Sequence, residues 1–319
     1  MATEKQGKTK KRVTKNAVNA EYLAMMNPPV SDDISYTHPV FAQCGLPLRN
    51  KAGRSEWLIK HGNVSLHIQA GKVAINRDGD LTDCDVPYGS AARVAMCHIN
   101  NHIVRAGSLD EAVNVDLGES FRKYCGKYNL PVSGQNAKQI QKQMVNIAQA
   151  RMTIGLFSET RARTINVPTI ASEIDFWLEN DDRQYTIWNP TLTVNPQYAK
   201  VVRERGVPQD MRVIVALYEN TGAIDVYQWL AYRLPLVTDA KGVFIPFDGK
   251  NGLHSIFGKD IADKYKFRQR FKEWLTLAVK YYPEAKIYWE DKGIRLFHSL
   301  PPVLPESSQQ KSLFFIDQK

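Results

Sequence analysis

The segment Lys264–Tyr282 constrains the fold more than any other, because its residues separate into two opposite faces at the period of an α-helix. The apolar residues fall within about 100° of the helix circumference. They are Phe267, Phe271, Trp274, Leu275 and Ala278. Asp263 is a favourable N-cap residue, and Pro283 stops the pattern. The sequence therefore predicts a long helix that buries an aromatic face.

The opposite arc of this segment is basic: five of the nine residues from Lys264 to Lys272 are Lys or Arg. The arc contains Lys266, Arg268, Arg270, Lys272 and Lys280, along with Gln269 and Tyr265, and Lys264 at the start of the helix is counted with its candidate DNA contacts. Like charges four residues apart destabilise a helix by about 0.2–0.5 kcal/mol per pair, and a phosphate partner would remove this repulsion. Arg and Gln also form bidentate hydrogen bonds with base edges in the major groove. The arc favours a DNA-reading helix, with a solvated charged face as the alternative.

The elements expected around this helix follow the order of a winged helix-turn-helix. Helices are expected at 210–218, 225–234 and 253–257, with a strand at 243–247 before the third of them. Two strands, 286–289 and 294–298, then flank a turn that contains Lys292 and Gly293. Lys292 would lie at the tip of the wing and contact DNA there.

A second set of elements in the same order is expected earlier in the chain. A hairpin around Trp57 and Val64 comes first, and helices at 88–104, 120–128 and 136–151 follow, the last capped by Asn136. Strands are expected at 152–157, 163–167 and 170–177. The first two form a ribbon, and Arg161 and Arg163, at and beside its turn, are candidate DNA contacts.

The helix at 136–151 differs in character from the basic one. Its core stripe is Ile140, Met144 and Ile147. Its predicted outer arc carries Lys138, Gln139, Lys142, Asn146 and Gln149. Side-chain amides with few charges suit the readout of adenine. They equally suit a solvated helix or a subunit interface, so DNA contact is one of three interpretations.

Together these patterns predict an α+β fold of two tandem winged helix-turn-helix domains. The expected divisions are a basic disordered arm (1–35), an N-terminal winged-helix domain (36–205), a C-terminal winged-helix domain (206–304) and a flexible tail (305–319). The arm is assigned from its lysines and arginine and its few apolar residues. They are Lys5, Lys8, Lys10, Lys11, Arg12 and Lys15.

The charge balance agrees with a polyanionic partner. Lys and Arg number 42 against 33 Asp and Glu, a formal net charge of +9. Such an excess favours nucleic acid first and an anionic membrane surface second. No apolar run reaches the roughly 18–20 residues that a membrane span needs, and the polar start lacks a secretory signal. We therefore expect a cytoplasmic protein that binds double-stranded DNA and no membrane.

Motifs for catalysis and metal binding are incomplete in this sequence. Gly252–Lys259 resembles a phosphate-binding loop, but Leu253 replaces a required glycine and Asp260 the Ser or Thr that holds magnesium. Cys97, His98 and His102 lack a fourth zinc ligand. We expect no catalytic residue, no metal and no cofactor, and hence a protein that is not an enzyme.

The end of the chain carries a short motif of its own. Gln310, Ser312, Leu313 and Phe314 fit the pattern Gln-x-Ser/Asp-Leu-Phe, which resembles the peptide that bacterial proteins dock on the DNA-polymerase sliding clamp. In such a peptide the Leu and Phe side chains enter an apolar pocket and the Gln amide is hydrogen-bonded at its rim. Packing of the tail on its own domain is the alternative.

Taken together, several segments between Pro87 and Val303 resemble the RepA-type family of plasmid replication initiators. They are Pro87-Tyr-Gly-Ser-Ala-Ala-Arg, Leu130-Pro-Val-Ser-Gly, Ile224-Asp-Val-Tyr-Gln-Trp-Leu-Ala-Tyr-Arg-Leu, Phe267-Arg-Gln-Arg-Phe, Tyr282-Pro-Glu-Ala and Leu300-Pro-Pro-Val. The resemblance implies binding to repeated sites at a plasmid origin, local opening of an AT-rich segment, and recruitment of the host helicase and initiator proteins. It also implies repression of the protein's own gene, usually by a homodimer, with the monomer active at the origin.

Two other functions remain open at this point. A transcriptional regulator would also use winged helices, but it needs neither two tandem reading units nor a clamp-binding tail. A nuclease or relaxase would need a nucleophilic tyrosine preceded by a His-apolar-His pair, which the sequence lacks. Footprinting on repeated sites separates the first from an initiator, and nicking of a supercoiled plasmid reveals the second.

Overall fold

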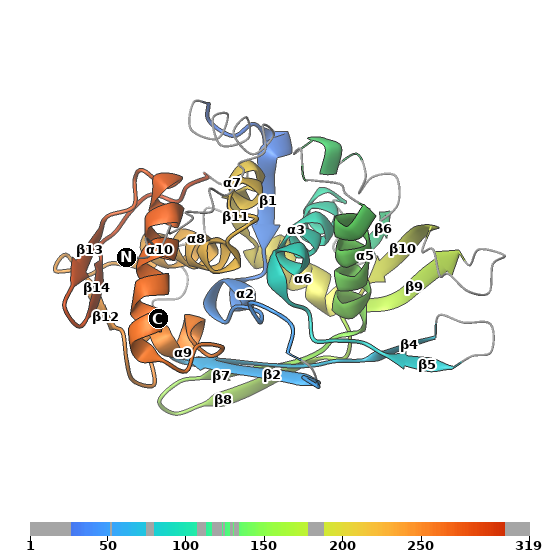
Figure 1. Ribbon diagram of the computed structural model, residues 1–319, viewed down its shortest axis with the longest axis horizontal. Helices are drawn as coiled ribbons and strands as arrows, with labels where there is room; N and C mark the ends of the chain where they lie inside the picture. The colour runs from blue at the N-terminus through green and yellow to red at the C-terminus, as the bar shows by residue number, and fades with distance from the viewer. Residues whose placement is uncertain are drawn as a thin grey trace, which may run out of the picture.

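Helices and strands alternate along the whole chain, and the fold is α+β as the sequence predicts. The computed structural model describes residues 27–303. Its gaps lie at 52, 75–79, 107–112, 117–122, 124, 128–129, 131–133 and 178–187. Two sets of elements follow one another in the described part, and their small sheets lie at opposite ends of the molecule (Figure 1). Short additional elements join these sets.

The second set corresponds closely to its prediction. Helices α7 (Met211–Ala216) and α8 (Thr221–Arg233) and the 3₁₀ turn η2 (Leu234–Leu236) precede β12 (Val243–Pro246), α9 (Leu253–Phe257) and α10 (Lys264–Lys280). The hairpin β13 (Ile287–Glu290) and β14 (Gly293–Leu296) follows, joined by a two-residue turn. The strand order is β12-β14-β13, so the hairpin returns its last strand to the centre of the sheet.

The first set repeats this arrangement with one insertion. Helix α3 (Gly89–Arg105), β6 (Val113–Asp116) and α5 (Gly134–Gln149) come first, and β9 (Ala171–Trp177) and β10 (Trp188–Val194) close the set. The strand order β6-β10-β9 matches that of the second set position by position. Helix α6 (Pro196–Arg205) leads on to the second set. The sequence analysis missed β6, β10 and α6.

The insertion is the ribbon β7 (Arg151–Phe157) and β8 (Ala162–Val167), and its place corrects a prediction. We expected this ribbon to be the wing of the first unit. Instead it pairs with the predicted hairpin β2 (Glu56–His61) and β3 (Val64–Gln69) in a separate sheet of order β2-β3-β7-β8. This sheet runs along the lower side of the molecule in Figure 1. The pairing is non-local, which is why strand patterns alone do not reveal it.

A seam of early elements joins the two sets. Strand β1 (Ile34–Thr37), preceded by the turn η1 (Ser31–Asp33), pairs antiparallel with β11 (Val207–Asp210). Helix α2 (Pro39–Gln43) packs against α8. The small hairpin β4 (Lys72–Ala74) and β5 (Leu81–Asp83) lies near α5. One contiguous apolar core extends through both sets, so the predicted boundary at 205/206 is a division of sequence and not of the core.

A buried ion pair crosses the seam from α3 to α8. Arg93 Nε and Nη2 each donate to a carboxylate oxygen of Asp225 at 2.5 Å. The remaining guanidinium hydrogens reach the carbonyls of Leu46, Pro47 and Gly89. Both side chains are less than 8% exposed. A desolvated pair is tolerated only when its hydrogen bonds are satisfied, and here they are.

Helix caps follow the sequence at two of three predicted positions. Asp263 accepts hydrogen bonds from the backbone amides of Tyr265 and Lys266, and Asp210 accepts one from Arg212. Asn136 does not cap α5, because the helix begins two residues earlier, at Gly134. The residues before that helix lie partly outside the described chain, as do most of 120–128 and the whole of the predicted arm up to residue 26.

Buried histidines make stability depend on pH. Burial lowers the pKa of His38 and of His98 to about 3, with His102 adding to the effect at His98. In the unfolded chain histidine titrates near about 6.5, so below that pH the unfolded state binds more protons. Stability is thus full above pH 6.5 and declines as the pH falls toward the folded values, by up to about 1.4 kcal/mol per pH unit for each histidine.

We expect the urea midpoint to fall markedly between pH 7 and pH 5. The His38→Asn variant should show a weaker dependence, because asparagine keeps an acceptor for the Val40 amide that His38 Nδ1 now caps. Equal midpoints at the two pH values would contradict this expectation.

Candidate nucleic-acid interface

Helix α10 is held by its aromatic face, as predicted. Phe267, Phe271, Trp274, Leu275 and Ala278 are all buried. Phe271 packs on Phe257 of α9, with ring centroids 5.6 Å apart. On the α8 side, a Cβ at Gly222 would lie 2.3 Å from the Trp274 ring, so only glycine allows α8 to approach so closely. The helix is therefore fixed in position by side chains that leave its other face free.

The outward face of α10 carries cations, one amide and the exposed carboxylate of Glu273. Lys266, Gln269 and Arg270 are exposed, and within the described chain no ion pair joins Lys266 or Arg270 to a carboxylate. Lys272 is exposed as well and lies 5.6 Å from the centre of the Trp289 ring of β13. An unpaired cation on a rigid helix is available to a phosphate at no cost in broken contacts. These side chains form the candidate interface.

Two members of the predicted basic arc are engaged within the protein. Arg268 Nη2 lies 2.5 Å from Asp248 Oδ2, and Lys264 Nζ lies 3.4 Å from Asp248 Oδ1. The Arg268 guanidinium also lies 5.3 Å from the centre of the Phe247 ring. Hydrogen bonding from Arg268 and the charge of Lys264 hold the pKa of Asp248 below its usual value. The sequence analysis missed Asp248, because it precedes α10 by a whole helix and loop.

The hairpin β13–β14 lies next to α10. Trp289 packs against Phe247 with ring centroids 4.8 Å apart, and its ring also lies near Lys272. The backbone amide of Phe247 donates to the carbonyl of Lys292 at 2.8 Å, which anchors the turn. The Lys292 side chain is exposed in that turn, and its contact with DNA stays a prediction.

Helix α5 matches its predicted core stripe but not its predicted outer arc. Ile140, Met144 and Ile147 are buried. Asn146 was expected to face outward, and this is wrong: it is 2% exposed, and its Oδ1 accepts a hydrogen bond from the Asp85 amide. The segment 84–88 lies across this side of α5, a long-range contact that helical periodicity does not contain.

The other residues of that arc are only partly available. Lys142 pairs with Asp85 at 2.7 Å, and Gln139 donates to the Tyr88 hydroxyl at 3.0 Å. Gln149 is half-buried, whereas Lys138 is exposed and has no ion pair within the described residues. The α5 surface therefore offers fewer free donors than α10.

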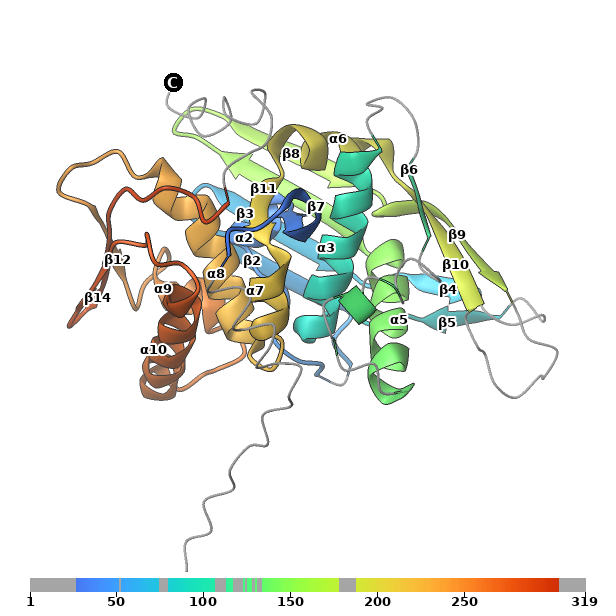
Figure 2. The same ribbon diagram turned by 90° about the horizontal axis from the view of Figure 1, so that it is seen from above.

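The remaining predicted residues fall in separate places. Arg161 and Arg163 are exposed, but Arg163 lies on β8 and Arg161 in the turn before it, so both belong with the sheet β2-β3-β7-β8 and not with the sheet of the α5 unit. Gln310, Ser312, Leu313 and Phe314 lie outside the described residues. Figures 1 and 2 place α10 and α5 on the same side of the molecule, with α8 and α3 between them, and α6 on the opposite side.

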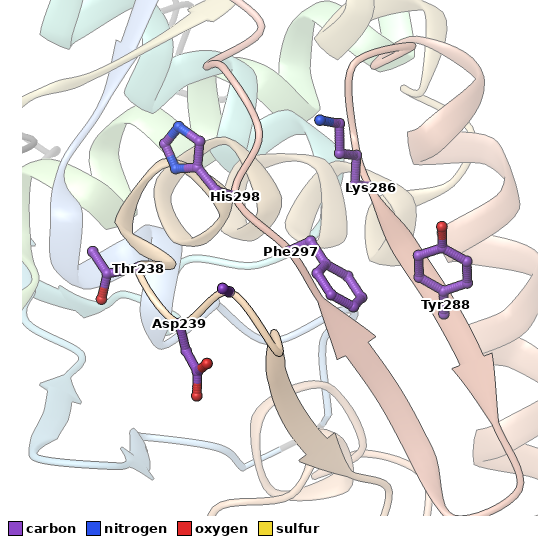
Figure 3. Close-up of a pocket in the computed structure, with 7 residues that line it drawn as sticks. Thr238, Asp239, Lys286, Tyr288, Phe297 and His298 are labelled. Atoms are coloured by element: carbon purple, nitrogen blue, oxygen red, sulfur yellow. The ribbon is translucent and has the colours of Figure 1, made fainter.

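A pocket of about 340 Å³ lies beside the sheet β12-β14-β13 (Figure 3). Its lining is Thr238, Asp239, Ala240, Lys286, Tyr288, Phe297 and His298. Successive side chains of a strand point to opposite faces, so Tyr288 faces away from the side on which Trp289 meets Lys272. The pocket is thus separate from the basic face of α10, and its charges are of both signs.

No cluster of three metal-ligating side chains occurs among the residues from 27 to 303 outside the gaps. His98 and His102 do stack, with ring centroids 4.7 Å apart, but His98 is buried. Among the described helices, none combines the length and the apolarity that crossing a bilayer requires.

Comparison with known proteins identifies the family. The model of the family described as "Plasmid encoded RepA protein" matches residues 86–248, just over half of the chain. The chain belongs to this family. The membership confirms the resemblance to plasmid replication initiators. The match runs from the entry to α3 through the first set of elements and into the second as far as Asp248. Helix α10 lies beyond the matched part of the RepA family.

Two other comparisons were made for this RepA family member. No curated protein matches the chain. Similar solved structures include selenomethionine derivatives of domains 2 and 3 of RctB, at 8% identity and a TM-score of 0.49, covering 82% of this chain and 98% of that one. A second structure of RctB domains 2–3 has 8% identity and a TM-score of 0.48, covering 81% and 94%.

Proposed function

We propose that this protein initiates plasmid replication by binding repeated double-stranded DNA sites at the origin, and that it does so as a binding protein without catalytic residues, metal or cofactor. The observation that carries the proposal is the two-sided helix α10. Its aromatic face is buried, while Lys266, Gln269 and Arg270 project outward with no ion pair to a described residue. Membership of the RepA family supports a role in plasmid replication.

The arrangement around α10 supports a winged helix in the second unit. A helix, a strand, two helices and a hairpin, with the hairpin's last strand central, are the parts of that motif. In it α10 is the helix that enters the major groove, and the turn at Lys292 is the wing that meets the backbone. Arg270 and Gln269 are the proposed base contacts, and Lys266 and Lys272 contact phosphate.

The first unit supports a second, weaker contact. It has the same strand order, and α5 lies on the same side of the molecule as α10 (Figures 1 and 2). One DNA duplex contacting that side would meet both helices. Lys138 of α5 is exposed and has no ion pair to a described residue, and we assign it a phosphate contact. Arg161 and Arg163, on their separate sheet, contact DNA only where it continues beyond the two helices.

Further parts of the proposal come from the family and from the tail. Opening of an adjacent AT-rich tract, recruitment of the host helicase and initiator proteins, repression of the protein's own promoter, and a homodimer that dissociates at the origin are what a RepA-type initiator would do. The motif at Gln310–Phe314 adds docking on the sliding clamp. A pull-down with purified clamp tests this, and equal binding by the Leu313→Ala/Phe314→Ala variant would overturn it.

Footprinting on the DNA that flanks the gene tests the main proposal. We expect protection of several repeats in phase, together with permanganate-reactive thymines in a neighbouring AT-rich tract. Protection of a single site without melting would instead indicate a transcriptional regulator. Incubation of supercoiled origin plasmid with magnesium should leave it intact, and a nicked product would replace the proposal with a relaxase or nuclease.

A further inference from the structure

One carboxylate sits at the edge of the basic face of α10 and engages two of its cations. Asp248 lies two residues after β12 and reaches Lys264 in the first turn of the helix and Arg268 in the next. Its oxygens approach their two nitrogens at 3.4 and 2.5 Å. The three side chains are 65%, 43% and 33% exposed for Lys264, Arg268 and Asp248, so the cluster is open to an incoming ligand.

The geometry of the helix separates these two cations from the others. At about 100° per residue, Lys264 and Arg268 project on the flank of α10 near Phe271, whereas Gln269 and Lys266 project from the outer face and Arg270 from the opposite flank. A helix in the major groove presents its outer face to base edges and its flanks to the phosphates on either side. Lys264 and Arg268 are therefore placed as phosphate-binding cations that the protein has already neutralised.

Neutralisation of flank cations acts unequally on two classes of DNA. Binding to random sequence depends almost wholly on cations that displace counterions from phosphates. Binding to a cognate site adds base contacts, here from Gln269 and Arg270. A carboxylate on the flank both pairs with two cations and repels the phosphate backbone. It therefore weakens binding to random-sequence DNA by a larger factor than binding to a cognate site.

We propose that Asp248 is a specificity-determining residue, which holds Lys264 and Arg268 back from the phosphates of non-cognate DNA. The inference rests on the proposed function of α10. Asp248 would thus help to discriminate cognate from non-cognate DNA, although it lies outside α10 and away from its outer face.

The test replaces Asp248 with asparagine, which has the same shape and no charge. The control is Glu204→Gln, which also removes one exposed carboxylate paired with a lysine. Glu204 belongs to α6, and Figure 2 shows that this helix lies on the opposite side of the molecule from α10. Fluorescence anisotropy measures binding to a footprinted fragment and to a scrambled duplex of equal length, at several salt concentrations. Thermal melting confirms that each variant is folded.

We expect Asp248→Asn to bind the scrambled duplex about three- to tenfold more tightly, with a slope of log K against log salt that is steeper by about one to two units, since each released cation contributes about 0.9. Affinity for the footprinted fragment should rise less. The ratio of the affinity for that fragment to the affinity for the scrambled duplex therefore falls. Glu204→Gln should change neither quantity, and Asp248→Glu should restore the wild-type ratio.

Two results would overturn the inference. In one, Asp248→Asn and Glu204→Gln give the same slope and the same ratio. In the other, Asp248→Asn weakens both complexes equally with an unchanged slope, which would reduce Asp248 to a structural support for α10. Failure of the proposed function is a different result: wild-type protein would bind both duplexes equally, and Arg270→Ala would leave both affinities unchanged.

Discussion

Replacing Asp225 with alanine is expected to lower the free energy of unfolding by about 3–5 kcal/mol, because it leaves the Arg93 guanidinium buried without its counter-charge. The two side chains are 3% and 7% exposed and are joined by two hydrogen bonds of 2.5 Å. Three backbone carbonyls would still accept from Arg93, but none carries a full charge. Urea denaturation followed by circular dichroism measures the change.

The matched control is Glu204→Ala on α6. This carboxylate pairs with Lys200 four residues earlier, and both side chains are exposed, so the loss should be about 0.5 kcal/mol or less. A second variant separates charge from packing: Arg93→Met with Asp225→Leu should recover most of the stability, because an apolar pair needs no counter-charge. A loss below about 1 kcal/mol in Asp225→Ala would show that the pair contributes little.

Removing the free cations of α10 is expected to have the largest effect on binding. Arg270→Ala should cost about 1–3 kcal/mol of affinity for a repeat and relax its sequence preference, because Arg270 is assigned to a base edge. Lys266→Ala should weaken binding to every sequence alike and reduce the salt slope by about one unit, because it is assigned to phosphate. Anisotropy titrations at several salt concentrations measure both quantities.

Lys200→Ala provides the control for these variants, since Lys200 is an exposed lysine of α6 on the far side of the molecule (Figure 2). It removes the same charge and should have little effect on affinity or slope. If Lys266→Ala and Arg270→Ala behave like Lys200→Ala, α10 is not in the interface, and the assignment of a reading helix is wrong.

The sequence predicts well those parts of the fold that depend on residues close together in the chain, such as an apolar stripe or a capping residue. The burial of α10 follows from an aromatic stripe at helical spacing, and its start follows from the Asp263 cap. The element order of the second unit, from α8 to β14, likewise follows from periodicity and turn residues. The core stripe of α5 is of the same kind, since Ile140, Met144 and Ile147 repeat at the helical period.

The errors have long-range causes. Asn146 is polar and spaced like a surface residue, yet the segment 84–88 folds over it and satisfies its amide oxygen. The ribbon β7–β8 has the pattern of a wing, but β3 offers it a better partner. In the candidate interface, Arg268 reads as a free cation until the loop after β12 brings Asp248 against it. Each of these errors depends on which distant segment of the chain packs against the residue. The residue pattern within one helix or strand does not contain that information.

The pairing of β1 with β11 has a consequence for how the chain is made. Ile34 pairs with Asp210, so nearly the whole first unit must leave the ribosome before β1 can find its partner. Contacts between residues so far apart in sequence form late, because the entropy of closing the intervening loop is lost before they contribute. Completion of the first unit therefore waits on synthesis of the start of the second. Because β1 and β11 pair only then, the two sets of elements complete their folding together.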